Sequence, residues 1–314
     1  MAPPTARGPS CAVSPTAIRL KRNRSNGGAI AGFQRAFWFG DADFVMPKSG
    51  DDLLAPDFVE RAMAVLLANP DCAMCHAGGL VFSDGSDRRS LYPAGHTLQA
   101  IGPDRVGRAC HVMQRYTSSP SFWGVYRRDA VDRLAPIRFR AGWDHVVLAE
   151  LALHGEIRHV PSALYFRRDG GKPLLTLARA ATEQGTRGVA PDGGLGELRW
   201  RTPLITTAYA HLEAFAAARL PESERIVLMQ HAADIFRARW LGGMRHEASR
   251  LRADLPGLLA MLAGAEPVLV QWRARTLCDA IRAVETILPD EDFTAAQIEV
   301  AAMAGETRIH AAAA

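Results

Sequence analysis

The sequence has no long uninterrupted apolar run, so it predicts no transmembrane helix. Its first residues lack the apolar segment of a secretory signal peptide. The chain has only five cysteines, an odd number that forms no paired disulfide framework. We therefore expect reduced thiols and a cytoplasmic location, with the inner face of the membrane as the alternative.

The chain also lacks a strong excess of either charge, because the formal net charge is +4 over 314 residues. This balance permits attraction to nucleotide phosphates or anionic surfaces but demands neither. The basic residues are dispersed and are not interleaved with aromatic ones, so we expect no nucleic-acid partner. The remaining composition, 48% hydrophobic, is typical of a globular protein with room for one large domain or two small ones.

The most informative stretch runs from residue 43 to residue 71. It predicts a short buried strand over 44–46, a turn, the adjacent carboxylates Asp51 and Asp52, and a helix. The helix begins at 55–57 and ends at Asn69-Pro70. Its apolar residues recur at helical spacing and predict one buried face, made of Phe58, Ala62, Met63, Leu66 and Leu67.

Asp51 and Asp52 follow the end of a strand, which is where open α/β sheets bind ligands. Two hard oxygen ligands on a short turn suit Mg²⁺ or Mn²⁺, with a diphosphate completing the coordination shell. The alternative is that both acids are solvated groups of an ordinary turn.

The segment DDLLAPDFVERAMAVLLANPDC resembles the part of family 2 glycosyltransferases in which a strand ends in D-x-D or DD, followed by L-x-x-P and a helix. The resemblance implies an α/β, GT-A-like (Rossmann-like) mixed sheet, with Asp51 and Asp52 holding the metal and the nucleotide-sugar. Ser49 stands where the first acid of D-x-D would fall. Asp41-Ala42-Asp43 is a literal D-x-D, but we interpret it as the turn into the strand.

A turn at residues 26–28 leads into a helix whose one face carries Ile30, Phe33, Ala36 and Phe37. This stretch resembles the family helix that precedes the metal strand. The resemblance implies that Asn26 and Gly27 bind the donor through backbone N–H groups. An ordinary glycine turn is the alternative.

Residues 121–128 resemble the family strand G-x-x-x-R, which implies that Trp123 packs near the donor sugar. A core aromatic is the equal alternative. Residues 129–134 predict a short helix. Residues 164–168 resemble the family's closing strand, after an edge strand over 156–161. Arg167 or Arg168 would then bind the diphosphate, although the His usual in the following loop is absent.

The stretch from Ala141 to Gly155 predicts a helix with Asp144 in its first turn. It resembles the helix whose Asp is the general base of inverting family members, with Trp143 in place of a leading acid. The resemblance implies that Asp144 removes the proton of the acceptor hydroxyl. We assign Glu150 a structural role and favour His145 less as the base.

Cys72-x-x-Cys75-His76 matches the haem attachment motif. We weigh four interpretations: haem attachment, a redox pair, a metal site, and small buried thiols in a strand over 72–82. The last is favoured, because no export signal and no second cysteine pair accompany the motif.

The expected organisation is a lead-in over 1–17, a partial GT-A-like domain over 18–173, a linker over 174–196, a helical region over 197–290 and a tail over 291–314. Helices are expected over 103–114, 203–219, 223–240, 244–262 and 267–288. Their basic outer faces are solvated, or bind a partner or a membrane surface. The strand-helix-strand segment that family members carry before the first helix is not found, so we expect an N-terminally truncated sheet.

Two hypotheses follow. The first is a metal-dependent, inverting glycosyltransferase that moves a sugar from a nucleotide-diphosphate donor to a hydroxyl of a glycan, a lipid-linked acceptor or a protein. The second is a non-catalytic remnant or binding protein on the same scaffold, which the missing segment favours. The oligomeric state is not predicted.

Overall fold

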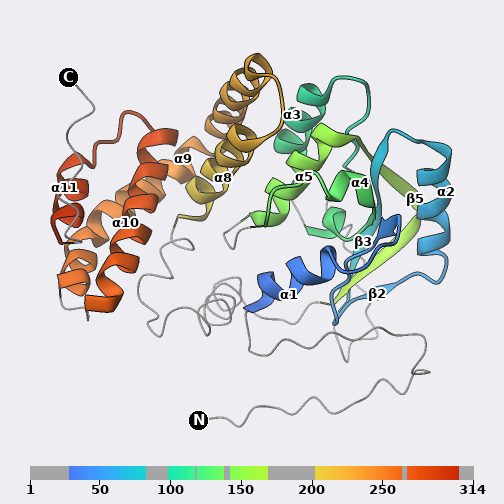
Figure 1. Ribbon diagram of the computed structural model, residues 1–314, viewed down its shortest axis with the longest axis horizontal. Helices are drawn as coiled ribbons and strands as arrows, with labels where there is room; N and C mark the ends of the chain where they lie inside the picture. Colours follow the sequence, from blue (N-terminus) through green and yellow to red (C-terminus); the bar gives the residue numbers. More distant parts are fainter. Residues whose placement is uncertain are drawn as a thin grey trace, which may run out of the picture.

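The computed structural model describes residues 28–82, 98–116, 119–137, 142–168, 202–263 and 267–303. Figure 1 shows a mixed sheet with its covering helices at one side and a group of helices at the other. The predicted lead-in over 1–17 and the predicted linker over 174–196 lie outside the described residues.

The described strands form one five-stranded sheet in the order β1-β4-β3-β5-β2. The long strands β3 and β5 pair in parallel, and the other pairs are antiparallel. The expectation of a mixed α/β sheet is therefore confirmed. The strands are β1 (Phe44–Val45), β2 (Leu53–Leu54), β3 (Cys72–Phe82), β4 (Val125–Arg127) and β5 (Glu156–Arg168).

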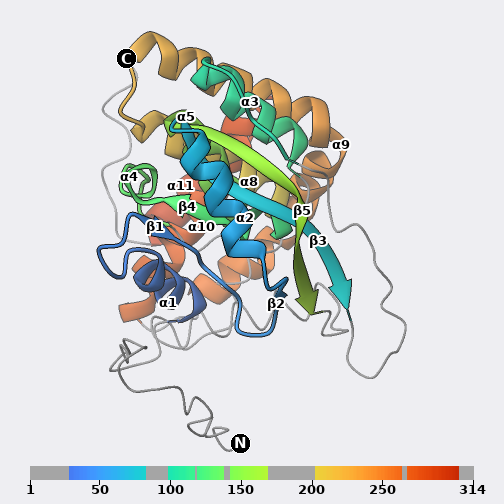
Figure 2. The ribbon, with the colours of Figure 1, turned by 90° about the vertical axis from the view of Figure 1, so that its right-hand side faces the viewer.

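Helices cover both faces of this sheet (Figure 2). The buried residues of α2 pack with Cys72, Cys75 and Tyr165 on one face. Residues of α3 and α5 pack with Met74 and Ile157 on the other. The elements of this part are α1 (Gly28–Phe37), α2 (Phe58–Ala68), α3 (Arg105–Arg115), the 3-10 helix η1 (Ser119–Phe122), α4 (Arg128–Val131) and α5 (Trp143–His154).

The α2 helix has the predicted ends, with Asp57 at its N-cap and Asn69 at its C-cap. Phe58, Ala62 and Leu66 are buried as expected. The prediction for Leu67 is wrong, because its side chain is 67% exposed. It lies one residue beyond Leu66, about 100° around the helix and away from the sheet.

Three other element predictions need correction. The strand expected from residue 121 begins only at Val125, because η1 precedes it. The strands expected over 156–161 and 164–168 are one strand, β5, which lies between β3 and β2. The buried strand expected over 44–46 is the half-buried β1, at the margin of the sheet.

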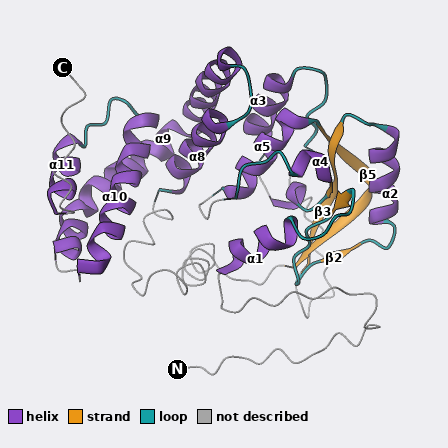
Figure 3. Ribbon diagram, in the orientation of Figure 1, coloured by secondary structure: helices purple, strands orange, loops and turns teal. Residues whose placement is uncertain are grey.

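All described strands lie in the first part of the chain, and the second part is helical (Figure 3). The predicted helical region is confirmed, with α8 (Pro203–Ala217), α9 (Glu222–Ala263), α10 (Pro267–Ile287) and α11 (Thr294–Met303). The two helices expected over 223–262 are one helix, and α11 lies in the expected tail. Within the described ranges, no helix combines the length and the apolar character needed to cross a bilayer.

The Cys72 and Cys75 thiols are both buried, with their sulfur atoms 3.6 Å apart. A register shift between Cys72 and Met74 brings both thiols into the cluster under α2. The prediction of small buried thiols is confirmed.

Candidate functional site

The two adjacent acids have different surroundings. Asp51 is exposed at the tip of the turn, whereas Asp52 is only 6% exposed. One carboxylate oxygen of Asp52 accepts a hydrogen bond from the Tyr165 hydroxyl, and the other accepts the backbone N–H of Arg168 at 2.8 Å. Asp52 thus fastens the turn to the end of β5.

Two cations also hold this turn through its backbone. The Lys48 ammonium donates to the carbonyl oxygens of Ser49 at 2.8 Å and Asp52 at 2.6 Å. The Arg168 Nε donates to the carbonyl oxygen of Asp51 at 2.9 Å. Positive charge therefore accumulates where a negatively charged diphosphate is expected.

Trp123 lies against this turn through Tyr165. The two rings are stacked, with centroids 6.2 Å apart and an interplanar angle of 5°. The next residue, Gly124, approaches β3 so closely that a Cβ would lie 2.3 Å from the Cys75 carbonyl oxygen. Gly124 is therefore a packing residue, and the half-buried Trp123 packs against both apolar clusters, as expected of a core aromatic.

Asp144 occupies the first turn of α5, as predicted. Its Oδ2 accepts the Tyr116 hydroxyl at 2.7 Å, and its Oδ1 accepts the backbone N–H of His145 at 3.0 Å. The helix starts after Gly142, which has a φ of 66°. A Cβ at this position would lie 2.3 Å from Thr207 Oγ1, so the position admits no side chain. These contacts fix the direction of the Asp144 carboxylate.

The charge of Arg167 makes a minor contribution at the two tyrosines that bind these carboxylates. Burial raises the pKa of Tyr116, which binds Asp144, and also the pKa of Tyr165, which binds Asp52. The Arg167 charge acts in the opposite direction on both phenols. The Arg167 side chain itself is exposed.

Ring contacts link the surroundings of the two acids. Phe33 of α1 contacts Trp123 at 6.2 Å and Trp143 at 4.9 Å between ring centroids. Trp143 directly precedes Asp144 in α5. The predicted residues Trp123, Asp144, Arg167 and the turn of Asp52 therefore belong to one neighbourhood. Asn26 and Gly27, also predicted to bind the donor, lie outside the described residues.

The His145 ring packs against Tyr116 and is held by a second histidine. Its Nδ1 lies 2.8 Å from His211 Nε2, and His211 Nδ1 lies 2.8 Å from the Thr207 carbonyl oxygen. A carbonyl only accepts, so His211 donates from Nδ1 and accepts from His145 at Nε2. Burial lowers the pKa of His145 well below its ordinary value, and His211 and Arg239 lower it further.

Glu150 has the structural role expected of it. It is buried, and its carboxylate accepts the backbone N–H of Ala135 at 2.8 Å. Burial raises its pKa to about 7, and the Ala135 hydrogen bond acts in the opposite direction.

Sequence patterns missed Lys48, Tyr116 and Tyr165. Tyr165 lies in the predicted closing strand, but its partner Asp52 is 113 positions away, so the local pattern carried no signal for the contact. Tyr116 follows α3 and is 28 positions from its partner, so spacing carried no signal for it. Among the described residues, no three His, Cys, Asp or Glu side chains form a group that could hold a metal by themselves.

No protein-family model matches the chain, and no curated protein matches it. Among solved structures, the chain is similar to the crystal structure of S. aureus TarS 1-349, with a TM-score of 0.42 and 10% sequence identity. That similarity covers 86% of this chain and 73% of that one.

Proposed function

We propose that the chain is a glycosyltransferase, hexosyltransferase-like and of family 2 type, which moves a sugar from a nucleotide-diphosphate donor to a hydroxyl acceptor. The carrying observation is that tyrosine hydroxyls fix two carboxylates. Tyr165 holds Asp52 and Tyr116 holds Asp144, the acids that the sequence resemblance assigns to donor binding and to base catalysis.

The turn can hold a divalent ion only if substrate and water complete the coordination shell. Both Asp52 oxygens already accept protein hydrogen bonds, but each carboxylate oxygen has a second lone pair. Asp51 is exposed and adds a second carboxylate. Mg²⁺ commonly uses one or two carboxylates together with substrate phosphates and water. Asp51 and Asp52 would hold Mg²⁺ or Mn²⁺ there, and the ion would neutralise charge on the departing diphosphate.

The chain's own groups would divide the remaining work. Arg167 and Arg168 bind diphosphate oxygens, and Trp123 packs against the donor sugar. Asp144 accepts the proton of the acceptor hydroxyl while that oxygen forms a bond to the anomeric carbon and the bond from carbon to diphosphate oxygen breaks. One such attack from the face opposite the leaving group inverts the configuration.

Tyr116 would act as a positioning residue for Asp144. Its hydroxyl occupies Oδ2, and the His145 N–H occupies Oδ1, so the carboxylate rotates little. The acceptor is a hydroxyl of a glycan, a lipid-linked molecule or a protein. We place this reaction in the cytoplasm, either in solution or peripherally at the membrane.

The second candidate is a non-catalytic binding protein on the same scaffold. The observation in its favour is that both Asp52 oxygens are already hydrogen-bonded to the end of β5. In that case Asp52 is a structural residue only, and the chain binds nucleotide without transferring sugar.

Calorimetric titration of UDP, GDP and dTDP, with and without Mn²⁺, tests the proposal. We expect Mn²⁺-dependent binding of one nucleotide, weakened about tenfold or more in Asp51→Ala, since hydrogen bonds and charges at such sites have about this effect. Glu60→Ala, an exposed acid on α2, is the matched control. If a folded wild-type chain binds none of the three, the proposal is wrong.

Turnover separates the two candidates. With the nucleotide known, its sugar conjugates are incubated with the chain and release of nucleotide diphosphate is measured. A transferase loses about 10²-fold or more of that rate in Asp144→Asn, without a matching loss of nucleotide affinity. Metal-dependent binding with no release from any conjugate supports the binding protein.

A further inference from the structure

A polar cavity of about 620 Å³ lies at the starts of β3 and β5. It is lined at these strands by Cys72, Ala73, Gly155 and Glu156. Asp52, in contrast, is hydrogen-bonded to Arg168 at the end of β5. The cavity and the candidate transferase site are therefore at opposite ends of the same strand.

Arg108 of α3 is the most informative residue of this cavity. It is only 9% exposed, and it has no carboxylate partner at hydrogen-bond distance among the described residues. Its Nε donates to the Ala152 carbonyl oxygen at 2.9 Å, and its Nη1 donates to the carbonyl oxygen of Gly102. In the part of the chain that the structure describes, Nη2 is left without an acceptor.

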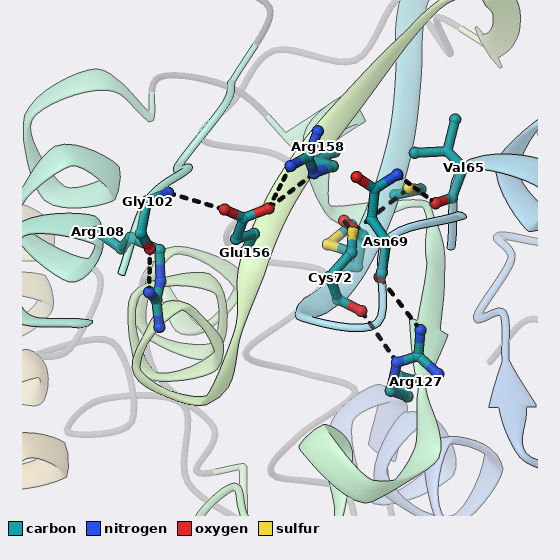
Figure 4. Close-up of polar contacts among 10 residues, drawn as sticks. Val65, Asn69, Cys72, Gly102, Arg108, Arg127, Glu156 and Arg158 are labelled. Carbon is teal, nitrogen blue, oxygen red and sulfur yellow. Dashed lines mark hydrogen bonds and ion pairs between the residues drawn. The ribbon is translucent and has the colours of Figure 1, made fainter. Parts of the chain in front are cut away.

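Arg127 of β4 also lines the cavity and is likewise hydrogen-bonded to backbone carbonyls. Its Nε donates to the Cys72 carbonyl oxygen at 3.1 Å, and its Nη2 donates to the carbonyl oxygens of Leu66 at 2.8 Å and Asn69 at 3.5 Å. Figure 4 shows Arg127 beside Cys72 and Asn69, and Arg108 beside Gly102. Both guanidinium groups line the cavity while bonded to neutral carbonyls only.

The cavity lining carries three acids and three arginines, and two of the acids already have a cationic partner. Glu156 is occupied, because its Oε1 accepts the Gly102 N–H at 2.9 Å and its Oε2 accepts Arg158 at 2.6 Å. Asp129 lies 3.9 Å from Arg133, which also lines the cavity. Asp71 is the remaining lining acid. The charges of Glu156, Asp104 and Asp71 all act on Arg108, but among the described residues no carboxylate is hydrogen-bonded to Arg108 or Arg127.

His154 adds a neutral polar group to the lining. Burial lowers its pKa to about 4, and the charges of Arg133, Arg105 and Arg108 contribute in the same direction. A bound anion would offset these cations and raise the pKa of His154. The ring therefore reports on the charge of whatever occupies the cavity.

We propose that this cavity is a second ligand site that binds the phosphate group of a small phosphorylated molecule. Arg108 and Arg127 present planar N–H donors that match phosphate oxygens, and Arg133 stands at the exposed side. The volume exceeds that of inorganic phosphate and lies in the range of small-molecule pockets, so the phosphate carries an organic group. This site is independent of the transferase proposal.

The test is calorimetric titration of the full chain with inorganic phosphate in EDTA, which removes divalent ions from the Asp51–Asp52 turn. We expect one bound phosphate per chain, with about tenfold or more weaker binding in Arg108→Gln because a charged hydrogen bond is lost. Arg133→Gln, an exposed side chain whose loss does not endanger folding, is expected to weaken binding several-fold.

Two controls locate the bound phosphate. Arg115→Gln, on the same helix as Arg108 but outside the lining, is expected to leave the affinity unchanged. Arg168→Gln, at the other end of β5, is also expected to leave the affinity for phosphate unchanged. In a ring-proton NMR titration, phosphate is expected to raise the pKa of His154. Absence of binding to the folded chain, an unchanged affinity in Arg133→Gln, loss confined to Arg168→Gln, or an unshifted His154 each overturns the proposal.

Discussion

At the scale of single residues, the buried acids are used mainly as hydrogen-bond acceptors for backbone N–H groups. Glu150 accepts Ala135, and Glu247 of α9 accepts the N–H groups of Leu204 and Ile205 at the start of α8, both at 3.0 Å. Burial raises the pKa of each carboxyl to about 7. Such groups make stability depend on pH near neutrality.

Glu150→Gln is expected to reveal this dependence. A carboxyl whose pKa rises from 4.5 to about 7 on folding binds protons more tightly in the folded chain. The stability that it contributes is largest at acidic pH and is lost as the pH rises through this window. Glutamine removes the titration, so relative to wild type it should stabilise the fold by about 2 kcal/mol more at pH 8 than at pH 5.

Urea denaturation at both pH values measures this difference. Glu60→Gln, which changes an exposed acid on α2, is the control and should change stability little at either pH. An equal effect of Glu150→Gln at the two pH values would contradict the pKa assigned to Glu150.

The candidate site shows what residue patterns predict and what they leave out. Asp51, Asp52 and Asp144 were predicted from local sequence, because each stands beside a strand or helix end with a recognisable pattern. Their partners Tyr165 and Tyr116 were not, since both contacts join segments far apart in the chain. Hydrogen bonds of this kind depend on tertiary packing, and a pattern within one segment carries no information on them.

At the scale of elements, α9 continues through Gly242 and Gly243, where two separate helices were expected. Glycine lowers helix propensity by about 1 kcal/mol per residue, which is why the pair predicts a break. Packing of α9 on α3 and α8 outweighs this cost. A Cβ at Gly242 would meet nothing within 4 Å, whereas a Cβ at Gly243 would lie 2.6 Å from Leu204 Cδ1.

The two glycines therefore give a matched pair of substitutions. Gly242→Ala should stabilise the protein by about 0.5–1 kcal/mol, because alanine loses less backbone freedom in a helix. Gly243→Ala should gain clearly less, or lose stability, because Leu204 must move. Chemical denaturation of both variants checks this order, and the reverse order would show that α9 packs differently on α8.

Contacts between distant segments also explain the other incorrect predictions of elements. Local patterns found β3, α2, α3 and α5 with nearly correct ends, because caps, prolines and apolar spacing mark them. They divided β5 at Pro161, yet β3 pairs with residues on both sides of that proline. The register shifts between Ala77 and Gly78, so Pro161 lies at an irregularity of the ladder, where proline is tolerated. Whether the strand continues past the proline depends on its pairing with β3, and the local sequence does not predict that pairing.

At the scale of the whole molecule, one apolar core extends from α1 to α11. It includes Phe37, Leu148 of α5, Phe215 of α8 and Val300. The helical part is also tied to the sheet part by polar contacts. Arg105 of α3 forms a pair of hydrogen bonds with Glu224 of α9, both at 2.7 Å.

This shared core predicts that the two parts unfold together. Urea transitions followed by tryptophan fluorescence and by far-UV circular dichroism should coincide. Phe236→Ala, which removes a fully buried ring of α9 that contacts His145 and His211, should lower the unfolding free energy by about 3–5 kcal/mol. Both signals should shift by the same amount.

The control for this experiment is Val227→Ala, an exposed apolar residue of the same helix, which should shift neither signal by much. Two separated transitions, with only one moved by Phe236→Ala, would mean that the sheet part and the helical part are independent folding units.

The hydrogen-bonded imidazoles of His145 and His211 also make the junction of α5 and α8 visible to spectroscopy. The Thr207 carbonyl fixes the direction of both hydrogen bonds, so each ring carries its proton on Nδ1. Free histidine prefers the other tautomer, and ring protons in contact with water exchange too fast to be seen. Two slowly exchanging imidazole N–H resonances thus report, without any label, that the helical part is seated against the sheet part.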